Sequence, residues 1–179
     1  MVQQDDRRLL SQIASGDAKA FRALVDAHAG RLVTYVTRIL GNQSEAEEIV
    51  QEVLLRVWQK ANDYTGQARA TTWLHRMAHN LAIDSLRRRR GQGALDVEQE
   101  DGPPSERPYE LLAQKQRASS LSDALSTLPE RQRMALLLRH EQGLKDPEIA
   151  EVLELSVDAV ESLLSRARKN LKQLLPEDV

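Results

Sequence analysis

The sequence predicts an all-α protein made of two small helical domains that a flexible acidic linker joins. Apolar residues recur at three- and four-residue steps along most of the chain, and no segment alternates in the manner of a strand. Residues 91–108, GQGALDVEQEDGPPSERP, have Gly and Pro at both ends, five acids against one Arg, and no apolar periodicity. A length of 179 residues fits two modules on either side of this segment, at 1–90 and 109–179.

The composition excludes several classes of protein. The chain has no cysteine, so disulfides, thiolate zinc sites and thiol nucleophiles are excluded. Apolar runs are only a few residues long and the N-terminus, MVQQDDRRLL, is charged, so neither a membrane span nor a secretory signal is expected. The expected location is the cytoplasm, without direct membrane contact.

Two helices are expected at the start of the first module. Leu9, Leu10 and Ile13 mark a short helix that stops near Gly16. Asp17 can cap a second helix, which ends at residue 41, a glycine of the C′ type. The apolar stripe of this second helix consists of Phe21, Leu24, Val25, His28, Leu32, Val36 and Ile39.

A third helix is expected to begin at Ser44, because Ser44 and Glu47 form a capping box of the S-x-x-E type. Its core stripe consists of Ala46, Ile49, Val50, Val53, Leu54, Val57 and Trp58. The fourth helix is TTWLHRMAHNLAIDSLRRRR at 71–90, and its inward residues are Trp73, Leu74, Met77, Ala78, Leu81 and Ala82. Residues 66–90 carry six Arg against one Asp, although the protein has a net charge of −2. Positive charge is therefore concentrated at the end of one helix.

The second module has the pattern of a helix-turn-helix. A helix over ALSTLPERQRMALLLRHEQGL is expected, with Pro129 near its first turn and Gly143 after its end. DPEIAEVLEL follows with Asp146 as N-cap and Pro147 at N1, and Ser156 caps the last helix. That helix bears Arg166, Arg168, Lys169 and Lys172, and the core positions are Ile149, Ala150, Leu153, Leu155, Val157, Val160 and Leu164. A bare helical hairpin would give the same apolar pattern, but the capped turn and the basic C-terminal half favour DNA binding.

The chain resembles the extracytoplasmic-function (ECF, group 4) sigma factors of bacteria, which belong to the sigma-70 family. The resemblance rests on four motifs that occur in the family's order: EAEEIVQEVLLRVW, TTWLHRMAHNLAIDSLRRRR, LPERQRMALLLRHEQGL and DPEIAEVLELSVDAVESLLSRARKNL. It covers about residues 18–90 and 110–175. It implies a sigma region 2 bundle over 1–90 and a sigma region 4 helix-turn-helix over 109–179, without the middle domain of the housekeeping type.

The resemblance also implies a function. A protein of this family binds core RNA polymerase and directs promoter-specific transcription initiation, with region 2 reading and melting the −10 element and region 4 reading the −35 element. An anti-sigma factor is expected to hold it inactive. No cofactor is expected, and the free protein is expected to be a monomer.

By resemblance, the helix at 71–90 faces the upstream edge of the −10 element, where the duplex opens. Arg76, Asn80 and Asp84 lie four residues apart and so share one face of that helix. They are expected to read bases, and Asn80 suits a base edge because its amide can donate and accept together. The alternative is a solvated polar face that ends in a basic tail.

Two further groups are expected to contact −10 DNA. Arg87, Arg88 and Arg89 would neutralise phosphates, a contact that attracts any sequence and weakens with salt. Gln67 and Arg69 belong to the loop GQAR at 66–69, which resembles the family segment that holds a base flipped from the duplex.

The helix at 44–60 has a second face, away from its core stripe. This face consists of Glu48, Gln51, Glu52, Leu55 and Gln59. The resemblance implies that it docks on the coiled coil of the largest polymerase subunit. Charged helix faces are usually just solvated, but Leu55 is apolar where such a face would be polar. Core RNA polymerase is therefore an expected partner.

The last helix is expected to read the −35 element. The residues assigned to this role are Ser156, Glu161, Ser162, Ser165, Arg166, Arg168 and Lys169. Glu161 and Leu163 stand where relatives often carry Lys or Arg. A glutamate can accept from the cytosine amine and a leucine can touch a thymine methyl, so an unusual −35 sequence is expected. Glu154 stands where relatives often have glycine, and a left-handed backbone there would cost roughly 1 kcal/mol.

Two other functions compete with this interpretation. His75 and His79 have the i, i+4 spacing of metal ligands on a helix, but Arg76 follows where a zinc protease has glutamate. No glycine-rich phosphate loop and no G-x-S-x-G motif occurs, so neither a catalytic residue nor a metal site is predicted. A stand-alone helix-turn-helix repressor or activator is the remaining alternative, and the acidic net charge counts against it.

Overall fold

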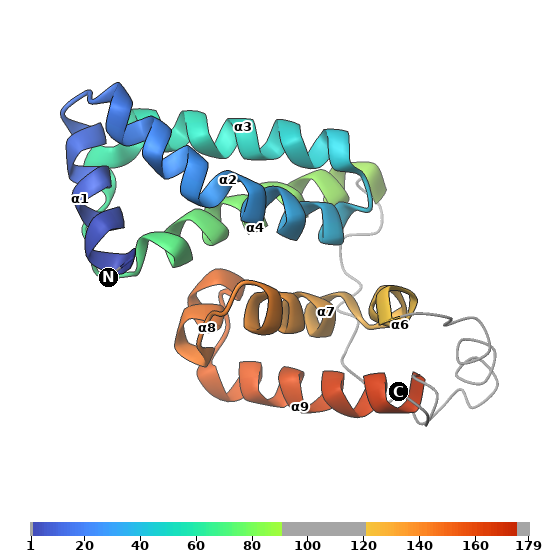
Figure 1. The fold of residues 1–179 in the computed structure, drawn as a ribbon. Coiled ribbons are helices and arrows are strands. Elements are labelled where there is room, and N and C mark those ends of the chain that lie inside the picture. The colour runs from blue at the N-terminus through green and yellow to red at the C-terminus, as the bar shows by residue number, and fades with distance from the viewer. Residues whose placement is uncertain (1, 91–120, 175–179) are drawn as a thin grey trace.

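The computed structural model describes residues 2–90 and 121–174, and every regular element within these two ranges is helical. The predicted all-α fold class is thereby confirmed. Residues 2–90 form one helical body and residues 121–174 a second, which we call the first and second modules (Figure 1). The segment predicted as a linker, 91–108, lies outside the described residues.

The first module has the four helices expected from its apolar periodicity. These four helices are α1 (Val2–Ala14), α2 (Ala18–Leu40), α3 (Gln43–Lys60) and α4 (Ala70–Arg90). A 3-10 turn, η1 (Ala61–Asp63), follows α3. The Asp17 carboxylate accepts from the backbone N–H groups of Lys19 at 2.8 Å and Ala20 at 3.2 Å, so it caps α2 as predicted. Gly41 is left-handed, with φ of 68°, and its N–H donates to the Thr37 carbonyl at the end of α2.

The start and the far end of α3 correct two predictions. Asn42 caps this helix by accepting from the Glu45 N–H at 3.1 Å, so the capping box assigned to Ser44 does not form. Asn at N-cap serves as well as Ser, and the helix gains two residues when the N-cap is Asn42 instead of Ser44. Trp58 is 39% exposed rather than in the core, because Val57 takes the inward position and the next residue is rotated by about 100°. The Trp58 ring meets Phe21 edge-on at 5.2 Å.

The second module divides what the sequence predicted as one helix. The elements there are α6 (Leu121–Thr127), α7 (Glu130–Leu136), the π-helical turn η3 (Leu137–Glu141), α8 (Asp146–Leu153) and α9 (Val157–Leu174). Pro129 causes the first break, because it cannot donate to the preceding turn and disfavours a helical backbone at Leu128. At the other end the Gln142 N–H donates to the Leu137 carbonyl at 3.1 Å, and Gly143, with φ of 70°, ends the segment as predicted.

The helix-turn-helix is formed by α8 and α9. Helix α8 begins one residue earlier than predicted, since Lys145 rather than Asp146 is its N-cap, and the Lys145 N–H donates to Glu148 at 2.7 Å. Glu154 ends α8 in the left-handed region with φ of 55°. Ser156 then caps α9 by accepting from the Ala159 N–H at 3.2 Å. Val157, predicted in the core, is 38% exposed because it lies in the first turn of α9, before the packed stripe begins.

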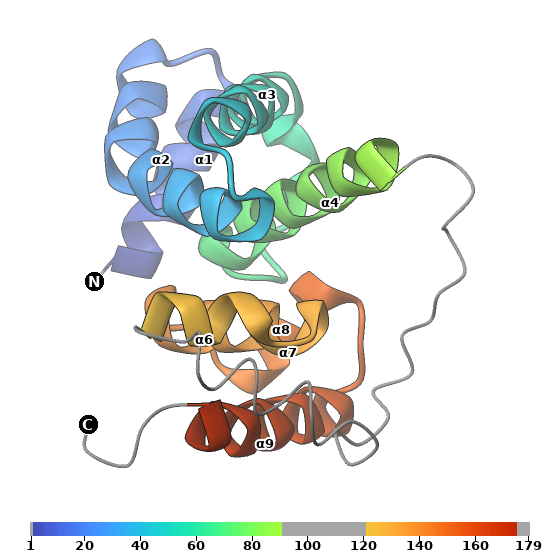
Figure 2. The same cartoon turned by 90° about the vertical axis from the view of Figure 1, so that its right-hand side faces the viewer.

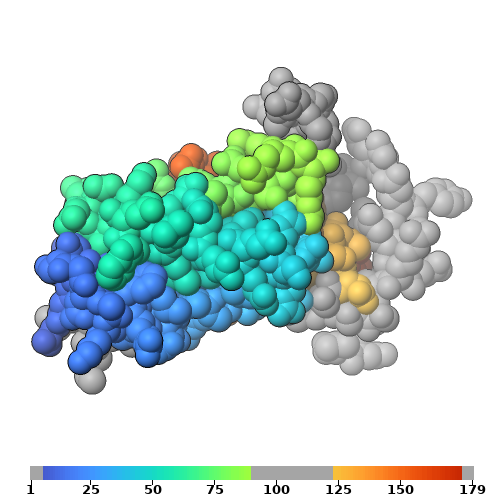
Figure 3. Space-filling view, turned by 90° about the horizontal axis from the view of Figure 1, so that it is seen from above, coloured from blue at the N-terminus to red at the C-terminus, as the bar shows by residue number. Residues whose placement is uncertain are grey.

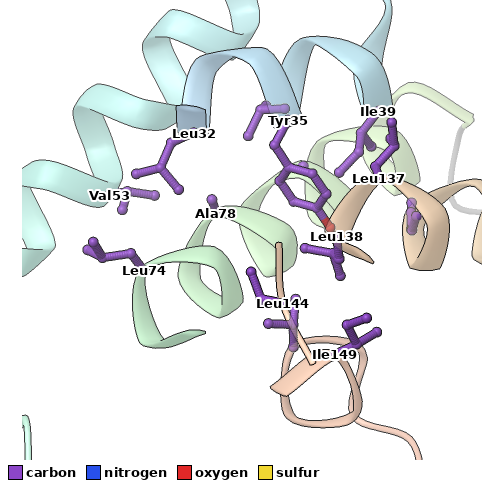
Figure 4. Packing of buried hydrophobic residues seen from close by; sticks show 14 of the residues in the cluster. Leu32, Tyr35, Ile39, Val53, Leu74, Ala78, Leu137, Leu138, Leu144 and Ile149 are labelled. Carbon is purple, nitrogen blue, oxygen red and sulfur yellow. The ribbon is translucent and has the colours of Figure 1, made fainter. Parts of the chain in front are cut away.

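The two modules pack against each other. Helix α4 contacts α8, and α2 contacts η3, while α9 lies on the far side of the second module (Figures 1 and 2). One continuous apolar cluster includes buried residues of both modules. Figure 4 shows Leu137 and Leu138 of the second module beside Tyr35 and Ile39 of α2, with Leu144 below α4.

Candidate nucleic-acid interface

Helix α4 separates an apolar side from a polar side. Its core residues Leu74, Ala78 and Ala82 are fully buried, and the residues predicted to read the −10 element all lie on the exposed side. These are Arg76, Asn80 and Asp84. Their spacing over two turns gives one row of side chains that combines a cation, an amide and a carboxylate. Such a row can donate to and accept from base edges.

The basic end of α4 is not uniform. Arg87 and Arg88 are exposed, and the Arg87 guanidinium lies 3.8 Å from the Asp84 carboxylate. Arg89 instead donates to the Leu40 carbonyl at 3.2 Å and forms an ion pair with Glu45 in the first turn of α3. Arg89 therefore ties the end of α4 to the corner between α2 and α3. A phosphate contact by Arg89 would compete with its hydrogen bond to Leu40 and its ion pair with Glu45.

The loop between η1 and α4 holds the other predicted −10 residues. Gln67 and Arg69 are both exposed. The Tyr64 hydroxyl donates to the Ala68 carbonyl at 2.7 Å and closes the loop from within. Burial raises the pKa of Tyr64, with a smaller opposing effect of the nearby Arg7, so the phenol keeps its proton and remains a donor.

Arg7 of α1 is a loop contact that sequence reasoning missed. Its guanidinium donates to the Gly66 carbonyl at 2.8 Å. Gly66 is left-handed with φ of 74°, and a Cβ atom there would lie only 2.1 Å from the Arg7 guanidinium. A charged residue in a short first helix carries no signal of a partner 59 positions away, so only the glycine hinted at a close backbone approach.

Helix α9 presents the predicted −35 residues on one outer face. Glu161, Ser162, Ser165, Arg166, Arg168 and Lys169 are all exposed. Ser156 is exposed too, but its hydroxyl serves as the helix cap. Leu163 corrects a prediction: its side chain is 3% exposed and packs in the core with Val160 and Leu164, so it does not reach a thymine methyl. The inward stripe at three- and four-residue steps leaves the leucine no other direction.

Among the residues that the structure describes, three ion pairs join the modules, and none of them was predicted from the sequence. Arg69 pairs with Glu148 at 3.0 Å, Arg76 pairs with Glu154 at 3.5 Å, and Arg38 of α2 pairs with Glu141 at 3.6 Å. Two of these arginines are predicted −10 residues. The sequence did hold a signal, since α8 and the residue that follows it carry four acidic side chains and no basic one: Asp146, Glu148, Glu151 and Glu154. The sequence does not indicate which arginines would form ion pairs with these acids.

His75 and His79 are buried where α4 meets its neighbours. His75 donates from Nδ1 to the Thr71 carbonyl at 2.8 Å, and its Nε2 lies 3.2 Å from the Gln142 side chain of the second module. Burial lowers the pKa of His75. His79 Nδ1 lies 3.0 Å from the Tyr35 hydroxyl. Within residues 2–90 and 121–174, no three His, Asp or Glu residues gather as a metal site would require.

The outer face of α3 is the last predicted surface. Glu48, Gln51, Leu55 and Gln59 are exposed, and Leu55 is 50% exposed although it is apolar. Glu52 is half-buried and accepts from Arg56 at 2.8 Å. Seen from above, α3 lies uncovered on the surface of the first module (Figure 3). The exposed Trp58, which the sequence analysis placed in the core, adds apolar area to this helix.

Comparison with known proteins assigns the family. The model of Sigma-70 region 2 matches residues 24–92, and the model of Sigma-70, region 4 matches residues 118–171. The ECF RNA polymerase sigma factor SigL of Mycobacterium tuberculosis is 33% identical over 170 residues, which cover 94% of this chain and 96% of SigL. The chain belongs to the ECF RNA polymerase sigma factors. As a member, it binds core RNA polymerase and directs promoter-specific initiation, as the sequence predicted.

Further relatives of this ECF sigma factor support the same family assignment. SigW of Bacillus subtilis is 26% identical over 179 residues, covering 94% of this chain and 96% of SigW. The solved structure of CnrH in complex with the cytosolic domain of CnrY superimposes with a TM-score of 0.71 at 25% identity, over 98% of this chain and 99% of that one. RpoE of Bartonella quintana, solved with the anti-sigma factor NepR, shares the fold at 23% identity, with a TM-score of 0.66 over 90% and 100% of the two chains.

The family assignment decides between the two expected functions. A stand-alone helix-turn-helix regulator does not account for a region 2 module over 24–92, so the sigma factor prediction is confirmed. None of the described helices is both long and apolar enough to cross a membrane.

Proposed function

We propose that this ECF sigma factor reads the −10 element with α4 and the loop before it, and the −35 element with α9. The observation that supports this most directly is the row formed by Arg76, Asn80 and Asp84. It lies on the exposed side of a helix whose opposite side is core, and it runs into exposed Arg87 and Arg88. On this proposal, the functional domains are 1–90 and 109–179, with 91–108 as linker.

Base reading and phosphate binding fall to different parts of α4. Asn80 is exposed in the middle of the helix and can satisfy both a donor and an acceptor on a base edge. Arg87 and Arg88 stand at the end, where they neutralise phosphates without regard to sequence. Arg89 contributes positive charge to the same end while its guanidinium holds the corner of the module.

The −35 element is read by the outer face of α9. The side chains that support this are Glu161, Ser162, Ser165, Arg166, Arg168 and Lys169, which are exposed while the inward stripe is buried. Because Leu163 is buried, Glu161 is the acidic side chain among these otherwise neutral or basic residues. Ser156 contributes by fixing the start of the helix and so the position of that face.

The outer face of α3 is the proposed contact with the coiled coil of the largest polymerase subunit. Glu48, Gln51, Glu52 and Leu55 form it, and the two exposed apolar residues Leu55 and Trp58 support a protein partner rather than solvent. The protein acts in the cytoplasm, without catalytic activity of its own. Its inhibitor is proposed to be an anti-sigma factor, in keeping with the solved complex of CnrH with the cytosolic domain of CnrY.

A transcription assay separates these roles. Run-off transcription with core RNA polymerase is measured on promoters that vary at each −10 position. The variants are Asn80→Ala and Arg88→Ala, and the control is Arg22→Ala, an exposed residue of α2. Arg88→Ala is expected to reduce initiation on all promoters and to flatten the salt dependence. Asn80→Ala is expected to change the preference among −10 sequences. An equal loss on every −10 variant would refute the reading role of Asn80.

A further inference from the structure

We propose that Arg69 and Arg76, two residues of the proposed −10 surface, also dock the second module of the same chain, so that the free sigma factor closes on itself. This inference rests on the proposed reading role of α4. It goes further, because it assigns a second, mutually exclusive occupant to the same residues. The occupant is formed by η3, α8 and the turn that follows α8.

The polarity of the cross-module ion pairs supports this docking. In all three pairs the arginine belongs to the first module and the glutamate to the second: Arg38 with Glu141, Arg69 with Glu148, and Arg76 with Glu154. Two of these arginines are in the proposed −10 surface. The carboxylates therefore occupy positions that DNA phosphates or bases would otherwise take.

An apolar seam supplies the cohesion. Both ion pairs include an arginine that is 40% exposed or more, and ion pairs open to solvent contribute little by themselves and weaken with salt. Leu138 and Leu144 of the second module are buried, and they belong to the same cluster as Tyr35 and Ala78 (Figure 4). The hydrogen-bonding contact between His75 and Gln142 lies in this seam. The seam holds the modules together, and the ion pairs determine which face of α4 is covered.

Glu154 is the most informative of the three acids. Among the residues that the structure describes, it is the one non-glycine residue with a positive φ, at 55°. Glycine would adopt this conformation without strain. The Glu154 side chain instead reaches Arg76 of the other module at 3.5 Å. The turn thus tolerates an unfavourable backbone at the position from which a carboxylate covers a −10 residue.

The docking is one-sided. Helix α9 packs on α7 and α8 and lies away from α4, so its −35 face remains open (Figure 2). On the −10 surface, Arg69 and Arg76 are held in ion pairs with the second module, while Asn80 and Asp84 stay exposed. Only one of the two promoter-binding surfaces is therefore partly occupied in the free chain. Opening requires a partner that engages the first module more favourably than the second module does.

Energy transfer in the free full chain tests the closure. The chain has no cysteine, so Ser15→Cys with Lys172→Cys gives one labelled site on each module. Glu148→Gln with Glu154→Gln is expected to lower the transfer efficiency at low salt, and the matched control Glu151→Gln on α8 is expected to leave it unchanged. Arg76→Glu should also lower it, and adding Glu154→Arg should restore it.

Binding of a single-stranded −10 oligonucleotide by the same unlabelled proteins gives the second readout. The Glu148→Gln, Glu154→Gln variant is expected to bind about fivefold more tightly than wild type, because a larger fraction is open. Unchanged transfer efficiency in the glutamate variants and in the charge swap would overturn the closure. If efficiency falls but oligonucleotide affinity does not respond to these variants or to Asn80→Ala, the docking stands and the reading role of α4 fails.

A different observation leads to a second inference: we infer that Arg7 is a positioning residue for the −10 loop. Its guanidinium donates to the Gly66 carbonyl at 2.8 Å, and α1 packs against η1 just before that loop. Gly66 leaves space for the guanidinium that a Cβ atom would fill. Arg7 thereby fixes the backbone between Thr65 and Gln67 from outside, while Tyr64 fixes it from within.

The −10 preference of Arg7→Ala is compared with that of Arg7→Lys and of the exposed control Arg8→Ala in the randomised −10 transcription assay. Arg7→Ala is expected to weaken selection at the position of the flipped base without altering the thermal unfolding midpoint, and Arg7→Lys to restore part of it. An unchanged preference in Arg7→Ala would overturn the positioning role, provided that Gln67→Ala alters it. If Gln67→Ala has no effect either, the loop's own DNA contact is refuted, and the positioning role falls with it.

Discussion

Like His75, His79 is a buried histidine of α4 whose pKa is lowered. Burial lowers the pKa of His79 to about 4, and the raising effects of Glu130 and Glu154 do not offset it. Complete burial raises the pKa of Tyr35, so its hydroxyl stays protonated and donates a hydrogen bond to Nδ1 of His79 at 3.0 Å. The ring is therefore neutral in the folded chain.

Stability is expected to fall with acidification because of this histidine. In the unfolded chain a histidine titrates near 6.5, so between that pH and about 4 the unfolded state binds more protons than the folded state. The contribution of neutral His79 to the free energy of unfolding is complete above about pH 6.5. It is lost as the pH falls toward 4, by up to about 3 kcal/mol. Urea unfolding between pH 7.5 and 5 measures it. His79→Gln should flatten the pH dependence, whereas the exposed control His140→Gln should not; equal slopes in all three proteins contradict the assignment.

Glu161 is the second residue whose chemistry can be tested alone. It is exposed on the −35 face of α9, where a carboxylate repels flanking phosphates unless a base donates to it. Repulsion in water at several ångströms stays below about 1 kcal/mol, whereas a good base contact discriminates by roughly 1–3 kcal/mol. Glu161→Lys is expected to raise non-specific binding and to erode −35 discrimination. Selection of a randomised −35 library by wild type and variant holoenzyme measures both, and an identical preference at every position contradicts base reading.

At the scale of the element, α3 allows a direct test of polymerase docking. Leu55 is half exposed on its outer face, so a charge there disturbs a partner far more than it disturbs the fold. Leu55→Glu is expected to weaken binding to core RNA polymerase about tenfold or more, as loss of a central interface residue does. Fluorescence anisotropy of labelled protein titrated with core enzyme measures the affinity. The matched control is Ala23→Glu, at an exposed position of α2. Equal affinities of the two variants would locate the polymerase contact elsewhere.

Periodicity predicted most of the helices, and the exceptions have local physical causes. Asp17, Gly41 and Gly143 ended or capped helices as expected, because their signals depend only on neighbouring backbone. The division of the long helix at Pro129 was visible in principle, since the restriction on the preceding residue argues against one continuous helix. The π-helical turn carried no such signal. Trp58 was oriented wrongly because adjacent apolar residues compete for one inward position, and the orientation of Leu163, left open by the sequence, is inward.

The candidate site was predictable in its surfaces but not in its contacts. The exposed rows on α4, α3 and α9 follow from the residues opposite the apolar stripe. The partners of Arg69 and Arg76 do not, because periodicity identifies which side of a helix is polar and says nothing of what a polar side chain meets across modules. The same limit hid the contact between Arg7 and Gly66.

On the scale of the whole molecule, the shared apolar cluster couples the stability of the modules. Both tryptophans, Trp58 and Trp73, belong to the first module, so their fluorescence reports on that module alone. Leu138 of the second module is fully buried in the shared cluster, and Leu138→Ala is expected to cost about 2–5 kcal/mol. The unfolding transitions followed by tryptophan fluorescence and by far-ultraviolet circular dichroism are expected to coincide and to shift together. A fluorescence midpoint that does not move would show that the modules unfold independently.

The cross-module surface also makes this sigma factor its own tethered ligand. Residues 91–120 connect the two described parts, and a chain of that length reaches at most about 100 Å when extended. A binding partner on the same chain acts at an effective concentration that the length of the connection sets, and tethered partners reach values on the order of millimolar. Closure then does not depend on how much protein the cell makes, and dilution does not relieve it. Cutting the tether would turn the same weak surface into a bimolecular contact that dissociates at ordinary cellular concentrations.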